Sequence, residues 1–315
     1  LRSLPGVEVV ATASRSTNHP LEIADVTGHD VLIGKRNRLT AELLAHPDRR
    51  LKHVARMGVG YDHIDIAACT RAGVLVSITP EAVRRPIASA ILALLLALAH
   101  RLFERDRLAR LGDWRTRFSI EGIGLGGRTL GLLGAGNIGA ELMRLVAPFD
   151  MRILVHDPGQ SVEALAAKGG VAASLETVFR EADFLVLACP LNPQTNRLVN
   201  AERLALMKPT AFLVNMARGE LVDEAALVEA LRAERLEGAG IDVFESEPTA
   251  RDNPLFTLPN VIVGQHNLGM TDELERIGQA AVVEAVIAVA EGRLPQGAIN
   301  PEARPELRQA ELRQE

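Results

Sequence analysis

The sequence contains very little cysteine, with only Cys69 and Cys189 among 315 residues. Two cysteines cannot form a disulfide framework, which is typical of proteins that stay in a reducing cytosol. The formal net charge is −5, so the composition offers no electrostatic basis for binding nucleic acid. The longest apolar run, residues 87–99, contains a serine and is too short to cross a bilayer. We expect a cytoplasmic protein that binds neither nucleic acid nor membrane.

Internal repeats, low-complexity tracts and a signal-peptide pattern are also missing from the sequence. It begins at Leu1 rather than at a methionine, which leaves open whether residues precede it. Hydrophobic residues make up 47% and charged residues 24%, as in ordinary globular proteins. A chain of this length can form two domains with separate cores.

The most informative stretch is residues 129–157, TLGLLGAGNIGAELMRLVAPFDMRILVHD. An apolar strand pattern leads into a glycine turn, an apolar-periodic helix follows, and a second strand pattern ends at Asp157. This is a βαβ unit with a G-x-G-x-x-G fingerprint and an acidic residue about 20 positions on. The plainer alternative is a glycine-rich turn that binds nothing, but the strand, helix and acid around it favour dinucleotide binding.

Each glycine of this turn has a physical role. Gly134 permits the tight turn, Gly136 lets a pyrophosphate approach the backbone, and Gly139 lets helix and strand pack closely. The pyrophosphate would lie on the free N–H groups at the start of the helix. Asp157 can accept hydrogen bonds from a ribose diol, and its charge repels a 2′-phosphate, so we predict NAD rather than NADP.

Residues 1–80 alternate between strand and helix patterns, which predicts a parallel sheet. The predicted strands and helices are listed here: strands 7–11, 30–33, 51–57 and 74–78; helices 40–45 and 64–72, the second capped by Asp62. Gly58, Val59 and Gly60 follow a strand, so their main-chain N–H groups could face a ligand. On the residues alone, a plain strand-to-helix turn is the favoured interpretation.

A long helix is predicted over residues 88–111, buried in its first half and amphipathic in its second. We interpret Trp114, the single tryptophan, as a packing or subunit-contact residue. The alternation then continues to the end of the chain. The predicted elements are strands 130–133, 151–155, 184–187, 211–215, 239–243 and 261–263, and helices 175–181, 201–207, 224–233 and 272–291. Six strands with helices on both faces predict the doubly wound dinucleotide fold.

Three residues that could do chemistry follow successive predicted strands: Arg218, Glu247 and His266. Ligands bind at the carboxyl ends of strands in open α/β sheets, so the topology can bring the three together. Histidine is the usual acid or base near neutral pH, a carboxylate can orient it, and arginine offers a planar fork for a carboxylate. Taken singly each has a plainer interpretation: a structural histidine, an arginine paired with Asp223 or Glu224, and a surface glutamate.

Several motifs in order over nearly the whole length decide between these alternatives. They are GVGYDHID (58–65), GLLGAGNIG (131–139), CPLNPQTNRLVN (189–200), NMARGELVDEAAL (215–227), GAGIDVFESEP (238–248) and the segment around His266. With them the chain resembles the D-isomer-specific 2-hydroxyacid dehydrogenase family. The resemblance implies NAD-dependent hydride transfer between a small 2-hydroxy acid and its 2-oxo acid, in an oxidoreductase that needs no metal.

In that family the arginine of N-x-A-R-G, the glutamate of D-V-F-x-x-E-P and the later histidine are catalytic, here Arg218, Glu247 and His266. The resemblance implies that His266 is the general acid in reduction and the base in oxidation. Glu247 would keep it protonated, and Arg218 would bind the substrate carboxylate and polarise the carbonyl. The resemblance also implies that the N–H groups of Val59 and Gly60 form a second contact with the substrate carboxylate.

The resemblance also completes the set that would bind the cofactor. Asp242 would lie near the nicotinamide carboxamide, and Cys189 would be a packing residue of the cleft rather than a nucleophile. The full predicted cofactor-binding set is Gly134, Gly136, Asn137, Ile138, Gly139, Asp157, Cys189, Pro190, Thr195, Met216, Ala217, Asp242 and His266.

The fold class implied is α/β, with two doubly wound parallel-sheet domains. A Rossmann NAD-binding domain, residues 91–284, would be inserted into a flavodoxin-like substrate domain, residues 1–90 and 285–315. Closure of one domain on the other would exclude water. Family members are usually dimers through the nucleotide domain, so we expect a homodimer to which the region of Trp114 contributes.

The chain departs from the family pattern at two loops. Residues 80–89 read PEAVRRPIAS, with Ser89 where a glutamate is usual, and residues 265–271 read QHNLGMT instead of P-H-x-G-G-x-T. We hypothesise that Arg84 or Arg85 binds a second anionic group on the substrate; two solvated arginines are the alternative. A different class of function, an NADH-sensing binding protein or corepressor of the same fold, also stays open.

Overall fold

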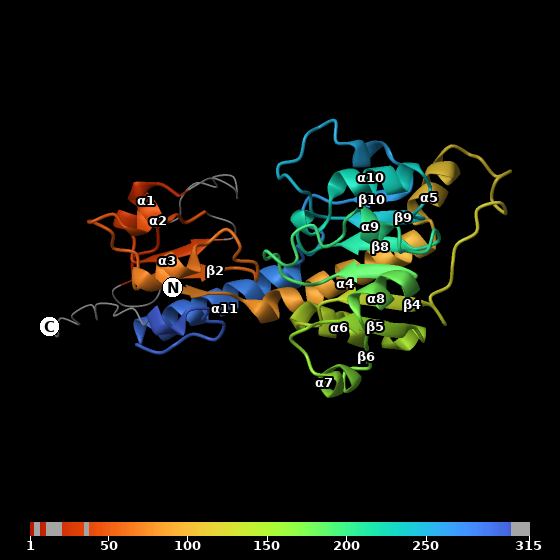
Figure 1. Cartoon of the computed structure of the whole chain (residues 1–315). Helices are drawn as coiled ribbons and strands as arrows, with labels where there is room; N and C mark the ends of the chain where they lie inside the picture. The colour runs from red at the N-terminus through yellow and green to blue at the C-terminus, as the bar shows by residue number, and fades with distance from the viewer. Residues whose placement is uncertain (3–6, 11–20, 35–37, 304–315) are drawn as a thin grey trace. The chain divides into compact units, whose positions relative to one another are not determined.

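The computed structural model describes residues 1–2, 7–10, 21–34 and 38–303. The chain divides into two compact units, one of Leu1–Val83 with Asp272–Glu315 and one of Arg84–Thr271. Each unit has its own parallel sheet (Figure 1). The expected α/β fold with two parallel sheets is therefore confirmed. The expected domain limits, 90/91 and 284/285, differ from these unit limits, and the assignment of functions to domains remains a prediction.

The unit Arg84–Thr271 is built on a sheet of seven parallel strands in the order β10-β9-β8-β7-β4-β5-β6. From β4, the strands β5 and β6 are added on one side of the sheet, and β7 to β10 are added on the other. The pair β4 and β7 is therefore the topological switch point. The strands are β4 (Thr129–Leu133), β5 (Arg152–His156), β6 (Val171–Ala172), β7 (Phe184–Leu187), β8 (Phe212–Asn215), β9 (Gly238–Ile241) and β10 (Val261–Val263).

Helices cover both faces of this sheet. Alternate residues of a strand point to opposite faces: Leu185 and Leu187 of β7 pack with α8, α9 and α10, whereas Phe184 and Val186 pack with α4 and α6. The helices are α4 (Pro80–Ala99), α5 (Leu102–Arg110), α6 (Asn137–Val146), α7 (Val162–Ala166), α8 (Leu175–Glu181), α9 (Ala201–Leu204) and α10 (Glu224–Arg232), with short 3₁₀ turns η1 (Ala147–Phe149), η2 (Gly219–Leu221) and η3 (Pro254–Thr257).

The other unit has a smaller parallel sheet in the order β1-β2-β3. Its elements are α1 (Ile23–Thr27), β1 (Val31–Gly34), α2 (Ala41–Leu44), β2 (His53–Arg56), α3 (Ile66–Arg71), β3 (Leu75–Ser77), α11 (Asp272–Ala290) and η4 (Pro301–Ala303). Val54 and Val76 face the core beneath α2 and α3, while Ala55 packs against Val282 and Val286 of α11. The sheet is therefore covered on both faces, as a parallel sheet requires.

Most predicted elements are present within two residues or so of their expected ends, and three are matched at both ends: β7, β10 and α8. Two predictions in the first unit are wrong. Residues 7–10 form no strand, and both Val9 and Val10 are exposed; Ala11 lies outside the described residues. The N-cap of α3 is Asp65, which accepts a hydrogen bond from the Ala68 N–H at 2.8 Å, rather than Asp62.

The long helix predicted over residues 88–111 is also wrong, because the segment forms two helices. Arg101 lies between α4 and α5 with φ of +49°, a left-handed conformation that an α-helix cannot contain. At its other end α4 runs through Pro86 and begins at Pro80. A proline inside a helix removes one backbone hydrogen bond, which is why the sequence pattern favoured a later start.

Helix α4 is long and apolar enough, at 20 residues and a mean hydropathy of 1.8, to match the composition of a membrane span. Its apolar side chains have a different explanation. Ile91, Leu94, Leu95 and Leu98 belong to the buried core that also contains side chains of β4 and α6. The apolar character of α4 therefore reflects its position in the core of the unit.

Candidate active site

The glycine turn between β4 and α6 lies at the switch point of the seven-stranded sheet. Gly134 has φ of +96°, and a Cβ there would lie 2.7 Å from the carbonyl oxygen of Ala188, in the segment that follows β7. A Cβ on Gly139 would lie 2.3 Å from the carbonyl oxygen of Gly134. Both distances are shorter than van der Waals contact, so these two positions require glycine for the turn and for close packing.

Gly136 differs from the other two glycines, because a Cβ there would meet nothing within 4 Å. This residue directly precedes α6, and no side chain caps that helix. The first N–H groups of α6, including those of Asn137 and Ile138, therefore follow directly on this open position. Open space beside a glycine and an uncapped helix N-terminus fit the pyrophosphate of a dinucleotide.

Asp157, directly after β5, lies against the same turn. Its Oδ2 accepts a hydrogen bond from the N–H of Ala135 at 2.7 Å, and its Oδ1 accepts one from Gly159 at 2.9 Å. The two bonds fix the carboxylate beside the glycine turn. Because each carboxylate oxygen has a second lone pair, the group can still accept hydrogen bonds from a ribose diol.

The segment after β7 contains Cys189, Pro190 and Thr195. The Thr195 hydroxyl donates to the Pro190 carbonyl at 2.7 Å and accepts from the Asn192 N–H at 2.8 Å, so it holds this turn together. Burial raises the pKa of the Cys189 thiol to about 11. A protonated thiol is a weak nucleophile, which agrees with the packing role expected for Cys189.

Alkylation tests this property of Cys189. Burial raises the pKa of Cys69 to about 11 as well, so both thiols stay protonated at pH 8. We expect iodoacetamide to react with the folded protein about 100-fold more slowly than with the urea-unfolded chain, because the thiolate fraction falls by that factor over two pKa units. Equal rates, measured by mass spectrometry, would show that Cys189 is a reactive thiol.

Arg218, Glu247 and His266 all lie beyond the carboxyl ends of neighbouring parallel strands. Arg218 follows β8, Glu247 follows β9 and His266 follows β10, and these three strands are adjacent in the sheet. Parallel strands end at one edge, so the three segments share that edge. Gly219, next to Arg218, packs on the backbone of Phe244, where a Cβ would lie 1.9 Å from the carbonyl carbon.

Glu247 and His266 are in direct contact. The Nδ1 atom of His266 lies 2.9 Å from each oxygen of the Glu247 carboxylate. A carboxylate can only accept, so Nδ1 carries the hydrogen that this contact uses. The side chains are only partly exposed, 26% for the histidine and 17% for the glutamate. This contact fixes the direction of the imidazole ring.

Asp242, at the end of β9, holds the turn that contains His266. Its carbonyl accepts the His266 N–H at 2.7 Å, and its carboxylate accepts the N–H groups of Asn267 and Leu268, each at 3.2 Å. Burial raises the pKa of Asp242, and these backbone hydrogen bonds oppose that rise. His266 has φ of +57°, so its turn needs such support. The sequence contained no signal for this role.

The turn of Arg218 is shaped by a buried asparagine. The Asn215 side chain donates to the Arg218 carbonyl at 2.8 Å and accepts the Ala217 N–H at 3.0 Å. The Arg218 guanidinium donates to the Ala217 carbonyl at 2.6 Å. Met216, in the same segment, is buried. Asn215 therefore fixes the backbone from which Arg218 projects.

The remaining predicted substrate residues are Val59, Gly60 and Arg84. Val59 and Gly60 follow β2 in the first unit, next to Gly58, which has φ of +130° and donates its N–H to the Thr79 hydroxyl at 2.8 Å. Arg84 is exposed on α4. Its neighbour Arg85 forms an ion pair with Glu141 at 2.6 Å. Within residues 1–2, 7–10, 21–34 and 38–303, no three His, Cys, Asp or Glu side chains form a group that could hold a metal.

An open parallel sheet with a glycine turn at its switch point and an acid after the next strand is the construction of a dinucleotide-binding domain. At the same edge, a histidine paired with a carboxylate can carry a proton to or from a substrate. Together these features define the nucleotide-binding unit of a dehydrogenase.

Comparison with known proteins identifies the family. The model of the "D-isomer specific 2-hydroxyacid dehydrogenase, NAD binding domain" matches residues 92–267. The chain is 41% identical over 260 residues to a glyoxylate reductase of Thermococcus onnurineus, covering 80% of this chain and 77% of that protein. The chain belongs to the D-isomer-specific 2-hydroxyacid dehydrogenase family.

Solved structures agree with this assignment. A glyoxylate reductase from Paecilomyes thermophila superimposes with a TM-score of 0.80 at 27% identity, covering 89% of this chain and 86% of that one. D-lactate dehydrogenase from Aquifex aeolicus, complexed with NAD and lactic acid, superimposes with a TM-score of 0.78 at 29% identity, covering 90% and 87%. The protein is an NAD-dependent dehydrogenase that transfers hydride between NAD(H) and a 2-hydroxy or 2-oxo acid.

Proposed function

We propose that this protein reduces a small 2-oxo acid such as glyoxylate to the corresponding 2-hydroxy acid, with Arg218, Glu247 and His266 as its catalytic residues. The observation that carries the proposal is the pair formed by Nδ1 of His266 and the Glu247 carboxylate. The identity to a glyoxylate reductase supports a small substrate.

In this proposal the chain's own residues bind the acid and move one proton. The reduced cofactor supplies the hydride when bound. His266 delivers the proton of Nε2 to the oxygen of the 2-oxo group, while Glu247 stabilises the charged ring through Nδ1. The guanidinium of Arg218 binds the substrate carboxylate and polarises the carbonyl. The N–H groups of Val59 and Gly60 form a second carboxylate contact, and Arg84 accepts any further anionic group.

The cofactor set is proposed from the glycine turn outward: the pyrophosphate on Gly136 and the start of α6, the ribose on Asp157, and the nicotinamide near Asp242. The open position at Gly136 and the anchored carboxylate of Asp157 support this arrangement. We further propose that residues 91–284 bind NAD and residues 1–90 with 285–315 bind the substrate. The other residues proposed along the cofactor are Gly134, Asn137, Ile138, Gly139, Cys189, Pro190, Thr195, Met216, Ala217 and His266.

We also propose a cytoplasmic homodimer. The region after α5 presents exposed apolar side chains, Leu111, Trp114 and Phe118, the last 86% exposed. Exposed apolar side chains of this size are typical of protein contact surfaces. Two unpaired thiols suit a reducing compartment.

Replacement of Asp157 by alanine tests the preference for NAD. We expect kcat/KM for NADH to fall about tenfold relative to that for NADPH, since the ribose diol loses its acceptor and a 2′-phosphate loses a repelling charge. The Asp157→Asn variant loses the charge and keeps one of the two acceptor oxygens, so comparison with Asp157→Ala shows how much a remaining acceptor contributes. If the ratio of kcat/KM for NADH to kcat/KM for NADPH stayed unchanged in both variants, Asp157 would not belong to the cofactor site.

Turnover of a panel of 2-oxo acids tests the proposed function as a whole. Glyoxylate, hydroxypyruvate and pyruvate are each mixed with NADH, and the loss of NADH absorbance is followed. We expect catalytic oxidation of NADH with at least one acid. Tight NADH binding with no oxidation on any of them would instead identify an NADH-sensing binding protein of the same fold.

A further inference from the structure

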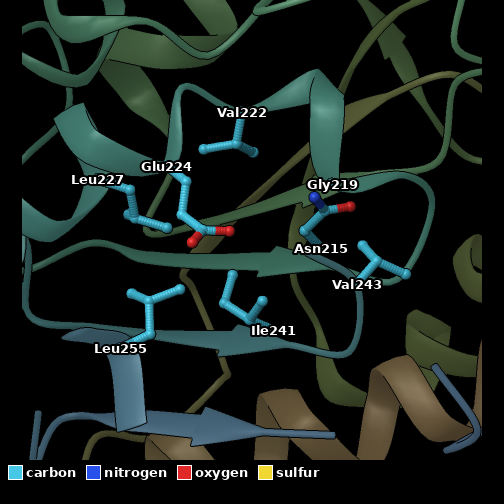
Figure 2. Close-up of a pocket in the computed structure, with 8 residues that line it drawn as sticks. All are labelled: Asn215, Gly219, Val222, Glu224, Leu227, Ile241, Val243 and Leu255. Atoms are coloured by element: carbon cyan, nitrogen blue, oxygen red, sulfur yellow. The ribbon is translucent and has the colours of Figure 1, made fainter. Parts of the chain in front are cut away.

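The carboxylate of Glu224 lines a small pocket that also includes residues of β9 and of the loop that follows it. The pocket is lined by Asn215, Gly219, Val222, Glu224, Leu227, Ile241, Val243 and Leu255 (Figure 2). Its cavity volume of about 10 Å³ is far below the ~300–1,000 Å³ of ordinary ligand sites, so it is not the cofactor site. Figure 2 shows the Glu224 carboxylate projecting among apolar side chains of this pocket.

A carboxylate among apolar groups is costly unless it is hydrogen-bonded. Both oxygens of Glu224 have donors from the loop that follows β9. Oε2 accepts the N–H of Glu245 at 3.1 Å, and Oε1 accepts from Nδ2 of Asn253 at 2.6 Å. Asn253 is buried, and its Nδ2 also donates to the Thr249 hydroxyl at 2.9 Å. Glu224 and Asn253 therefore connect two points of one loop.

Those two points flank Glu247 symmetrically in the sequence. Glu245 is two residues before it and Thr249 is two residues after it, so the bridge closes the base of the turn that presents the catalytic carboxylate. The N–H of Phe244, the residue before Glu245, donates directly to Glu247 Oε1 at 3.1 Å. The consecutive N–H groups of Phe244 and Glu245 are thus held by the two carboxylates of Glu247 and Glu224.

We infer that Glu224 and Asn253 are positioning residues that hold the Glu247 carboxylate against Nδ1 of His266; the inference rests on the proposed function of that pair. Capping of α10 does not account for Glu224, because Asp223 is the N-cap and accepts the Ala226 N–H at 3.1 Å. A loosened loop lets Glu247 move away from the imidazole, and the charged form of His266 loses its stabilising partner.

The charged groups around these residues define what the experiment must hold constant. His266 is faced by two acids, Glu247 at Nδ1 and Asp242 from the end of β9. Beside Glu224, Arg197 pairs with the Glu245 carboxylate at 2.6 Å and lies 3.8 Å from Asp223. The substitutions below leave all of these groups in place.

The test compares Glu224→Gln and Asn253→Ala with Glu229→Gln, which removes the same charge from an exposed position on α10. In both loop variants we expect kcat/KM for 2-oxo acid reduction near neutral pH to fall about tenfold. The basic limb of the pH profile should move about one unit lower, because the imidazolium loses its proton more easily. NADH affinity should change less than twofold. Glu229→Gln should match the wild type.

A second measurement does not depend on turnover. The NMR titration of the His266 ring, identified by its loss in a His266→Gln protein, should move to lower pH in both loop variants. If the wild type turns over none of the acids but this shift is present, the proposed function fails and the positioning inference stands. An unchanged titration and pH profile in both variants, whether or not activity falls, would overturn the inference.

Discussion

Replacing His266 with alanine lowers kcat for 2-oxo acid reduction by about 10²–10⁴-fold, the usual contribution of a general acid. The loss arises because no other group takes the place of the imidazole whose Nδ1 lies 2.9 Å from Glu247. NADH affinity should stay within about twofold of the wild type, since every residue of the glycine turn is unchanged. Stopped-flow kinetics and fluorescence titration of NADH measure the two quantities separately.

His100→Ala is the matched control for this result, because it removes an exposed histidine at the end of α4 in the same unit. It should leave both kcat and NADH affinity as they are. If His266→Ala lost NADH affinity together with turnover, His266 would act in holding its turn or the cofactor rather than as the proton donor. Retained turnover would remove it from the proposed mechanism altogether.

Replacing Gly136 with valine weakens NADH binding by about 100-fold, equivalent to ~2.7 kcal/mol. A Cβ at this position meets no protein atom within 4 Å, so we expect the fold to tolerate valine, and its side chain would occupy the space proposed for the pyrophosphate. Isothermal titration calorimetry measures the affinity, and thermal unfolding should show a Tm close to that of the wild type. Gly124→Val, also at an open position, is the control that should change neither.

Gly139→Ala should lower the free energy of unfolding, whereas Gly136→Val should leave it nearly unchanged. Its Cβ would lie 2.3 Å from the carbonyl oxygen of Gly134, so helix α6 must move away from β4. Such overpacking costs about 1–3 kcal/mol of unfolding free energy.

A stable Gly136→Val protein that binds NADH normally would contradict the placement of the cofactor on this turn.

Regular features of the fold were predictable because they repeat a local pattern. The strands of the seven-stranded sheet show as short apolar runs, and the glycine turn has its own spacing, so both were found. Strand β6, of two residues, and helix α7, of five, were missed because neither is long enough to show a period. The break at Arg101 was missed because a left-handed residue has no apolar signature.

The candidate site likewise contains features that the sequence could predict and features that it could not. Strand order places Glu247 and His266 at one edge, and the family motifs then name them, so their contact could be anticipated. The roles of Asp242 and Glu224 could not be. Asp242 binds main-chain N–H groups, which no side-chain pattern records. Glu224 bonds to an asparagine 29 residues away, and that contact depends on the path of an irregular loop.

The hydrogen bond from Ala135 to Asp157 has a consequence for redesigning the coenzyme preference. One carboxylate both faces the proposed ribose site and ties down the peptide that shapes the phosphate-binding turn. Exchanging it for a basic or neutral side chain to admit NADPH also releases that peptide, so affinity for either coenzyme declines. A successful switch therefore needs two substitutions, one to accept the extra phosphate and one to restore an acceptor for the Ala135 N–H.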